Sequence, residues 1–167
     1  MIVPTCRSCG ADLSVTVLDL GEQPLSNAYV LPGEESSEQR YPLHARFCTD
    51  CYLVQVDDVV PPEDIFGDYA YFSSFSDTWV EHARCYVEAV VERFDLDERS
   101  RVVEIASNDG YLLRHFIGRS VPVLGIEPAA NVAQAADAIG VPTLVRFFGR
   151  ETAESVVDER GKADLIV

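Results

Sequence analysis

Four of the five cysteines occur as two closely spaced pairs, a pattern typical of a site that binds one metal ion. The first pair is Cys6-Arg-Ser-Cys9, and the second is Cys48-Thr-Asp-Cys51. Two intervening residues let both thiolates of a pair reach one ion, and Gly10 supplies the tight turn after the first pair. Two pairs complete a tetrahedral shell of four sulfurs, which predicts a structural zinc ion. Two disulfides, four buried thiols or redox-active pairs are the less favoured alternatives.

A second group of residues that could bind a ligand follows two predicted strands in the C-terminal part. The segment Glu104-Ile-Ala-Ser-Asn-Asp-Gly110 ends one strand and opens a helix, and Glu127 closes the next strand. An acid at that position can accept hydrogen bonds from both hydroxyls of a ribose. The turn lacks the G-x-G-x-x-G pattern, so it suits an amino acid end and a ribose better than a pyrophosphate. We therefore expect S-adenosylmethionine and not NAD as the cofactor. The residues expected to bind it are Glu104, Ser107, Asn108, Gly110, Glu127 and Pro128.

The elements around the cysteines are predicted to be short strands. Alternating or apolar residues indicate strands at 13–20, 41–47 and 52–56, whereas turn signals fill 21–33. This pattern predicts a β-rich zinc module. A helix is expected to begin after Ser76, a good N-cap residue, and to continue to about Phe94 because apolar residues recur there at helical spacing.

The remainder of the chain alternates between strand and helix patterns. Strands are predicted at 101–106, 122–127, 141–146 and 163–167, with helices at 111–117, at 129–139 and up to about residue 161. This order implies a doubly wound parallel sheet, whose ligands bind at the carboxyl ends of the strands.

The predicted fold class is therefore α/β, with a small β-rich zinc-binding module followed by the first part of a doubly wound, Rossmann-like domain. The expected divisions are 1–66 for the zinc-binding module, 67–98 for an aromatic and serine-rich segment with a connecting helix, and 99–167 for the first half of the cofactor domain. The hydroxyl side chains of 69–76 suit the lining of a polar pocket.

Composition and charge narrow the class of partner. The net charge of −15 would repel a phosphate backbone, so we expect no nucleic-acid partner. No apolar run approaches the ~20 residues of a membrane span, and no signal peptide precedes Cys6, so we expect a cytoplasmic protein without membrane contact. In a reducing compartment, cysteine pairs bind metal more often than they form disulfides.

Several motifs, in this order, resemble the zinc-containing, S-adenosylmethionine-dependent sugar C-methyltransferases. They are Cys6-x-x-Cys9-Gly10, Cys48-x-x-Cys51-x-Leu-Val-Gln55, Tyr71-Phe-Ser-Ser-x-Ser76, Glu104-Ile-Ala-Ser-Asn-Asp-Gly-Tyr-Leu-Leu113 and Gly125-Ile-Glu-Pro-Ala-Ala-Asn-Val132. The resemblance covers nearly the whole chain. It implies an N-terminal zinc domain, a central cofactor domain and a further C-terminal domain.

The resemblance also implies a substrate and a reaction. The substrate would be a nucleotide-linked 4-keto-deoxysugar of an antibiotic pathway, methylated on a carbon next to its ketone, with Tyr71 as a substrate-facing hydroxyl. The general base and the rest of the catalytic domain are expected beyond residue 167, so this chain would be the N-terminal part of the enzyme and inactive alone. The alternatives are a freestanding zinc-binding interaction module and an NAD-dependent dehydrogenase, which the missing glycines disfavour.

Overall fold

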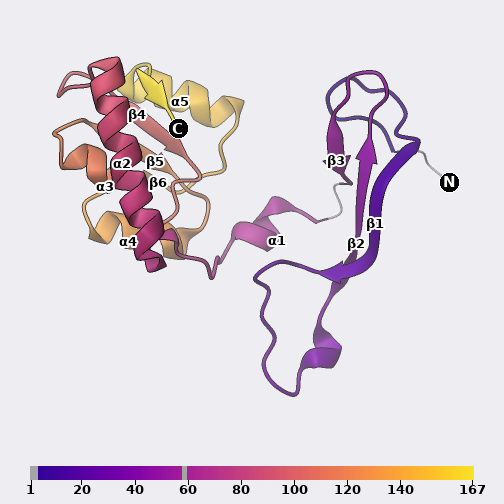
Figure 1. The fold of residues 1–167 in the computed structure, drawn as a ribbon. Helices are drawn as coiled ribbons and strands as arrows, with labels where there is room; N and C mark the ends of the chain where they lie inside the picture. The colour runs from indigo at the N-terminus through magenta and orange to yellow at the C-terminus, as the bar shows by residue number, and fades with distance from the viewer. Residues whose placement is uncertain (1–3, 58–59) are drawn as a thin grey trace. The chain divides into compact units, whose positions relative to one another are not determined.

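The computed structural model of the protein describes residues 4–57 and 60–167, which divide into two compact units (Figure 1). The first unit extends to Ile65 and the second begins at Phe66. The first contains a three-stranded antiparallel sheet, and the second contains a four-stranded parallel sheet. The predicted fold class is confirmed.

The sheet of the first unit has the order β1-β2-β3. Its strands are β1 (Val15–Pro24), β2 (Arg40–Phe47) and β3 (Val54–Val56), with a 3-10 helix at Glu35–Ser37 between the first two. Strand β1 extends past the predicted end at residue 20. Its pairing with β2 shifts register between Asp19 and Glu22, and Gly21 within that shift has a φ of 65°. The irregularity absorbs the glycine without ending the strand, so the predicted turn starts only after Pro24.

The second unit alternates helices with parallel strands after one long helix. A short helix, α1 (Pro62–Phe66), spans the division between the units. The later elements are α2 (Asp77–Phe94), β4 (Val102–Ile105), α3 (Leu113–Ile117), β5 (Val123–Ile126), α4 (Ala130–Ala138), β6 (Thr143–Leu144), α5 (Arg150–Arg160) and β7 (Leu165–Ile166). Strands and helices lie where the sequence predicts them, with shorter ends. Ser76 caps α2 as expected, since its Oγ accepts the N–H of Trp79 at 3.3 Å.

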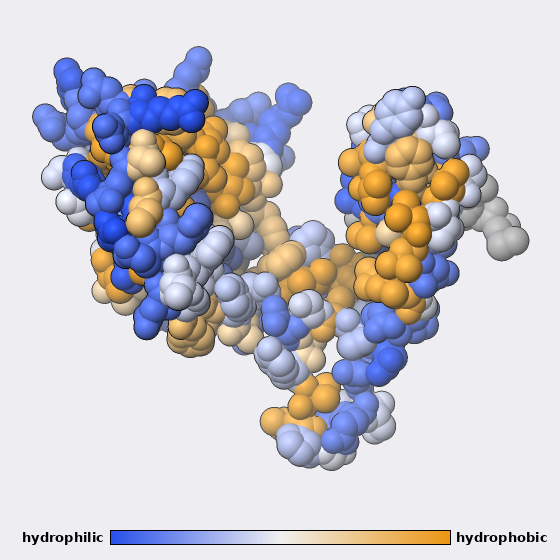
Figure 2. Space-filling view, viewed as in Figure 1, coloured by the Kyte–Doolittle hydropathy of each residue, from blue (hydrophilic) through white to orange (hydrophobic). Residues whose placement is uncertain are grey.

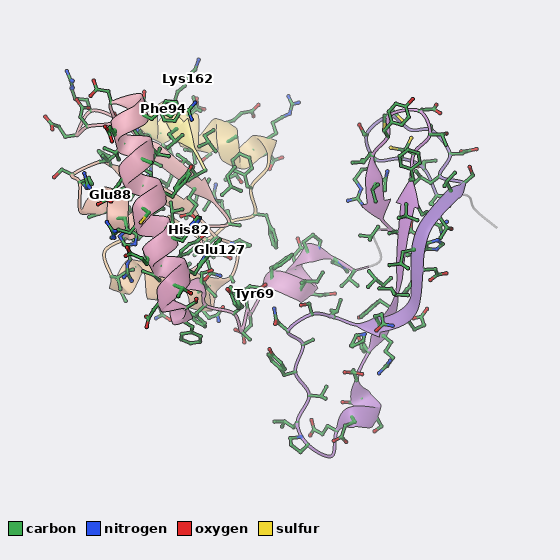
Figure 3. The ribbon with its side chains drawn as sticks, viewed as in Figure 1. Tyr69, His82, Glu88, Phe94, Glu127 and Lys162 are labelled. Carbon is green, nitrogen blue, oxygen red and sulfur yellow. The ribbon has the colours of Figure 1, made fainter. Side chains whose placement is uncertain are left out.

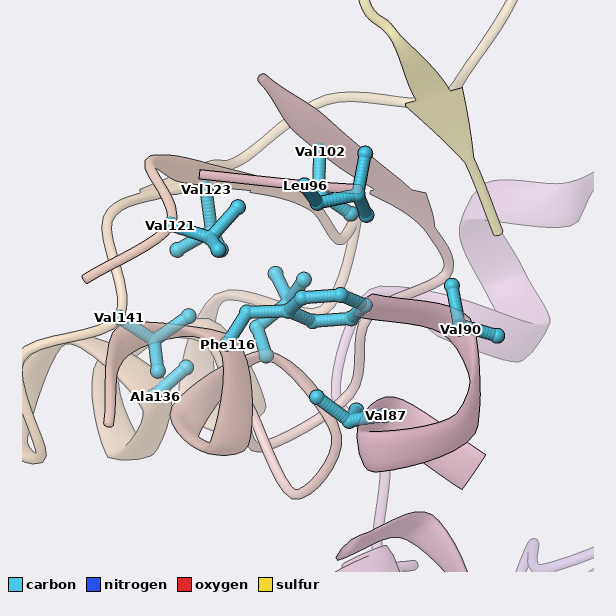
Figure 4. Close-up of a cluster of buried hydrophobic side chains, with 10 residues drawn as sticks. Val87, Val90, Leu96, Val102, Phe116, Val121, Val123, Ala136 and Val141 are labelled. Atoms are coloured by element: carbon cyan, nitrogen blue, oxygen red, sulfur yellow. The ribbon is translucent and has the colours of Figure 1, made fainter. Parts of the chain in front are cut away.

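Helices cover both faces of the parallel sheet, as a doubly wound fold requires. On one face, Phe116 of α3 lies in the middle of a cluster with side chains of α2, β4 and α4 (Figure 4). On the other face, Val156 of α5 packs against Val103, Leu124 and Ile126. The strand order is β6-β5-β4-β7, so the chain crosses from one side of β4 to the other after β6. In such folds, the crevice for ligands opens at the carboxyl ends of the strands at this reversal.

The surface shows where apolar side chains remain open to solvent. Figure 2 shows hydrophobic residues gathered on the visible side of the first unit, whose sheet exposes Val17, Leu18, Leu20 and Val54. None of the helices in the described ranges is long and apolar enough to cross a bilayer.

Candidate functional site

The four paired cysteines meet at one point in the first unit. Their four sulfur atoms all lie within 4.8 Å of one another, and the Cys6–Cys51 and Cys9–Cys48 sulfur pairs are each 3.5 Å apart. Sulfurs at ~2.3 Å from a tetrahedral zinc ion would be about 3.8 Å from one another. The donor set and its spacing therefore fit one zinc ion with a closed shell of four sulfurs.

The backbone forms the same turn around each cysteine pair. The N–H of Gly10 donates to the carbonyl of Cys6, and the N–H of Tyr52 donates to the carbonyl of Cys48. Gly10 and Tyr52 each follow the second cysteine and adopt left-handed conformations, with φ of 77° and 64°. Tyr52 is therefore part of the turn and not, as predicted, the first residue of a strand. A left-handed tyrosine costs about 1–2 kcal/mol, which the metal site must offset.

The proximity of the four sulfurs shifts the pKa values of neighbouring thiols in opposite directions, and a bound cation would favour the deprotonated form of all four. The backbone N–H of Cys9 is the main cause that lowers the pKa of Cys6 to about 6, with the Gln55 amide adding to it. The backbone at Ala11 lowers the pKa of Cys9, but the neighbouring Cys48 sulfur, burial and the other sulfurs raise it by more. Together these causes raise the pKa of Cys9 to about 12. Four adjacent thiolates repel one another, so all four deprotonate together only when a divalent ion neutralises them.

Gln55 supports the metal centre from outside the sulfur shell. Its Nε2 donates to Cys6 Sγ at 3.2 Å, and its Oε1 accepts the backbone N–H of Arg7 at 3.1 Å. Gln55 is buried in β3, so the amide joins the sheet to the first cysteine turn. Partners of this kind fix the orientation of metal ligands.

We expect Gln55→Leu to lower metal affinity by about 10–100-fold, because the thiolate of Cys6 loses its donor and the turn loses its acceptor. Gln55→Glu should weaken binding more, since it places a negative charge against the thiolates. Competition with a chromophoric chelator measures the affinity, and Gln39→Leu, at an exposed position, is the control. Equal affinities in Gln55→Leu and the control would contradict this role.

The loop after β4 has a repeated left-handed conformation. Ala106, Asn108 and Gly110 have φ of 58°, 49° and 76°, so every second residue lies in a region that favours glycine. The two non-glycine residues store roughly 1–3 kcal/mol of strain each, and strain of this kind clusters at functional sites. The loop therefore has the backbone shape that glycines would allow, although the sequence supplies only one of them.

Three buried carboxyl groups converge on this loop. Burial is the main cause that raises the pKa of Glu104 to about 8, and the negative charges of Asp109 and Glu127 contribute to this rise. Glu104 Oε2 and Asp109 Oδ1 are buried and have no hydrogen-bond partner among the described residues. Unpaired buried acceptors are costly, so a ligand that donates hydrogen bonds or carries positive charge would be stabilised here.

Glu127 joins the loops that follow β4 and β5. Its Oε2 accepts the N–H of Asn108 and its Oε1 accepts the N–H of Ala129, both at 2.9 Å. Only 5% of Glu127 is exposed, so its first task is to satisfy two buried donors. The sequence predicts a ribose ligand at this position but gives no sign of these two hydrogen bonds.

The other predicted cofactor residues occupy different surroundings. Ser107 is fully buried against Gly125, where an added Cβ would lie 2.4 Å from Ser107 Oγ. A Cβ at Gly110 would lie 2.9 Å from a methyl carbon of Val141. Both the lack of space and the left-handed φ therefore favour glycine at this position. Pro128 is partly exposed in the bend between β5 and α4.

A cavity of about 410 Å³ lies beside Glu104 in the second unit. One wall comes from α2, where Trp79 stacks on His82 with ring centroids 5.3 Å apart. Tyr111 stacks on the same Trp79 at 6.1 Å. Trp79 is 44% exposed and lines this cavity, because the buried face of α2 is formed by Ala83, Val87 and Val90.

The segment with the predicted substrate-facing tyrosine crosses the same edge of the sheet. Tyr71 is half exposed, and its ring centroid is 6.4 Å from that of Tyr69. Ser73 is buried, and its backbone N–H donates to Asn108 Oδ1 at 2.8 Å. Figure 3 shows Tyr69 and Glu127 toward the end of the unit where α2 begins. Asn108, predicted to bind the cofactor, thus uses its side chain to hold this segment.

Comparison with known proteins gives two matches. Residues 6–66 match the model of a family described as "Putative zinc binding domain". The chain is 34% identical over 167 residues to the C-methyltransferase NovU of Streptomyces niveus, and the alignment covers 98% of the chain. It covers 39% of NovU, so the chain spans well under half the length of this relative.

Proposed function

We propose that this chain, whose sequence belongs with the C-methyltransferases, is the zinc-binding part and the beginning of the cofactor-binding part of an S-adenosylmethionine-dependent C-methyltransferase. The similarity along 98% of the chain supports the reaction class. One observation carries the choice of cofactor. The buried carboxyl group of Glu104, close enough to Asp109 and Glu127 to feel their charges, lines a cavity with an aromatic wall.

These surroundings favour a ligand that carries positive charge. The ammonium group of S-adenosylmethionine can donate to the unpaired oxygens of Glu104 and Asp109. Its sulfonium group suits the faces of aromatic rings such as those of Trp79 and Tyr111. The pyrophosphate of NAD would instead bring negative charge against three carboxyl groups, which disfavours a dehydrogenase. The second lone pairs of the Glu127 oxygens remain suited to ribose hydroxyls.

The proposed acceptor is a nucleotide-linked 4-keto-deoxysugar of antibiotic biosynthesis. When bound, the cofactor supplies a methyl group on a positively charged sulfur. A base takes the proton beside the sugar ketone, and we expect that base outside the present chain. Within the chain, Tyr71 would hold the sugar through its hydroxyl, and the zinc ion would have a structural task only. A reducing, cytoplasmic setting keeps the four thiols available for the metal.

We expect Glu104→Gln to weaken binding of S-adenosylmethionine by about 10–100-fold in a protein that contains the whole cofactor domain, because a charge-assisted hydrogen bond is lost. Binding to the unsubstituted protein should tighten as the pH rises from 6 toward about 8, the pKa of Glu104, and Glu104→Gln should lose that trend. Calorimetry measures both, and S-adenosylhomocysteine, which lacks the sulfonium charge, should bind with a smaller dependence on Glu104.

Stability gives an independent measurement on the present chain. Because the folded-state pKa of Glu104 lies above its ordinary value of 4.5, the folded protein retains a proton that the unfolded chain loses. The free energy of unfolding should therefore fall between pH 4.5 and about 8, relative to Glu104→Gln. Glu92→Gln, at an exposed position of α2, is the control. A pH-independent difference from Glu104→Gln, together with unchanged cofactor affinity, would overturn the assignment of this carboxyl group.

The second candidate function is a zinc-binding interaction module without activity. The apolar side chains exposed on the sheet of the first unit favour it, since such surfaces often bind partners. Incubation of the longer protein with radiolabelled S-adenosylmethionine and a panel of nucleotide-linked 4-keto sugars separates the two. Methyl transfer to a sugar supports the enzyme, and absence of cofactor binding supports the module.

A further inference from the structure

The segment Tyr69–Ser74, whose last two residues begin a 3-10 helix (Ser73–Phe75), is held by side chains from the loop after β4 and from the start of α4, at the carboxyl edge of the parallel sheet. Asn131, near the start of α4, accepts the N–H of Tyr69 at 3.1 Å and donates to its carbonyl at 2.8 Å. Asn108, after β4, accepts the N–H of Ser73 at 2.8 Å and donates to the carbonyl of Tyr71 at 3.1 Å. Asp109 Oδ2 accepts the N–H of Ser74 at 3.1 Å.

Each asparagine therefore hydrogen-bonds the backbone through both the nitrogen and the oxygen of its side-chain amide, a pair of bonds termed a grip. One donor and one acceptor bond replace the bonds that a neighbouring strand would make, and they fix the orientation of the amide. The bond from Ser73 to Asn108 is buried, so water does not compete with it. The bonds of Asn108 include one to the carbonyl of Tyr71, whose half-exposed side chain takes no part in this backbone network.

The position of this segment depends on the loop that follows β4. Asn108 is itself left-handed, and its N–H donates to the buried Glu127 carboxylate. A change in the conformation of Asn108 would alter both its bond to Glu127 and its grip on Tyr71 and Ser73. The side chains of Asn108 and Asp109 thus join the loop assigned above to the cofactor to the segment assigned to the sugar.

We infer that Asn108 and Asn131 are positioning residues, which set the placement of Tyr71 through the backbone of Tyr69–Ser74. The inference rests on the proposed function for what Tyr71 does, but not for how it is held. Asn131 makes its bonds to Tyr69 only at the far end of the segment from Asn108, so its substitution separates placement of the segment from the conformation of the loop.

Hydrogen exchange at single amides tests how the segment is held. In Asn131→Ala, the N–H of Tyr69 should lose protection by roughly tenfold, because it loses its acceptor. Asn131→Asp retains the acceptor and should retain most of that protection. Gln134→Ala, at an exposed position on the same helix, should change nothing. In Asn108→Ala, the N–H of Ser73 should lose its protection instead. Exchange at Tyr69 that is the same in Asn131→Ala and Gln134→Ala would overturn the inference.

Kinetics of the longer, active protein test what the grip is for. Asn131→Ala should lower kcat at least tenfold while the Kd for S-adenosylmethionine changes by less than about twofold, and Asn131→Asp should restore part of kcat. A residue needed only for folding would lower cofactor affinity and kcat together, and that result would overturn the positioning role. If exchange behaves as expected but no variant, nor the unsubstituted protein, transfers a methyl group, the grip stands and the proposed function fails.

Discussion

Cys48→Ser is expected to abolish stoichiometric metal binding and to unfold the first unit. Cys48 is fully buried in the sulfur cluster, and a serine oxygen is a poor replacement for a thiolate ligand of zinc. Structural zinc contributes on the order of 10 kcal/mol to the folding of small modules, which exceeds what the core around Leu13 can supply without it. Elemental analysis measures the metal, and circular dichroism measures loss of the β-sheet.

Cys85→Ser is the matched control for this experiment. Cys85 is exposed on α2 in the second unit, so its replacement should leave both metal content and sheet unchanged. Chelation of the unsubstituted protein should reproduce the effect of Cys48→Ser, because the two treatments remove the same ion. A Cys48→Ser protein that retains one zinc ion and its sheet would refute the four-sulfur site.

Glu127→Ala is expected to destabilise the second unit by about 2–6 kcal/mol. The substitution leaves two buried N–H groups, those of Asn108 and Ala129, without an acceptor, and each unpaired group costs about 1–3 kcal/mol. Chemical denaturation of the present chain measures the loss. The stability of Glu127→Gln should lie between those of the unsubstituted chain and Glu127→Ala. The glutamine retains one oxygen acceptor but places an amide NH2 against the other backbone N–H.

Glu154→Ala provides the comparison, because Glu154 is exposed on α5 and should change stability by less than about 0.5 kcal/mol. If Glu127→Ala is as stable as Glu154→Ala, the two hydrogen bonds do not contribute as described. The stability of the apo chain therefore distinguishes the structural task of Glu127 from its proposed task in binding.

The metal site could be predicted because its signal is local in the sequence. Each Cys-x-x-Cys pair specifies its own turn, so the ligands follow from spacing alone. The left-handed Tyr52 could not be foreseen, because the residue type favours a strand and only the equivalence with Gly10 reveals the turn. The parallel sheet was predictable for a similar reason, since apolar strands and intervening helices repeat along the chain.

The arrangement around Asn108 could not be predicted, because it depends on contacts between residues distant in the chain. Asn108 lies in a loop whose pattern suggests ligand binding, and nothing in the sequence pairs it with Tyr71 or Ser73. The cavity wall formed by Trp79 was missed because periodicity shows which face of a helix is apolar, but not where the buried stripe ends.

Both asparagine grips contact only main-chain atoms of the segment that they hold. The same bonds would form whatever side chains stood at positions 69 and 71, provided the backbone stayed extended. Ring size and hydroxyl placement over the carboxyl edge can therefore vary in evolution without rebuilding the support beneath them. A family built on this support could diversify the molecules it accepts through one or two exchanges, while the strands, the loops and the two asparagines remain as they are.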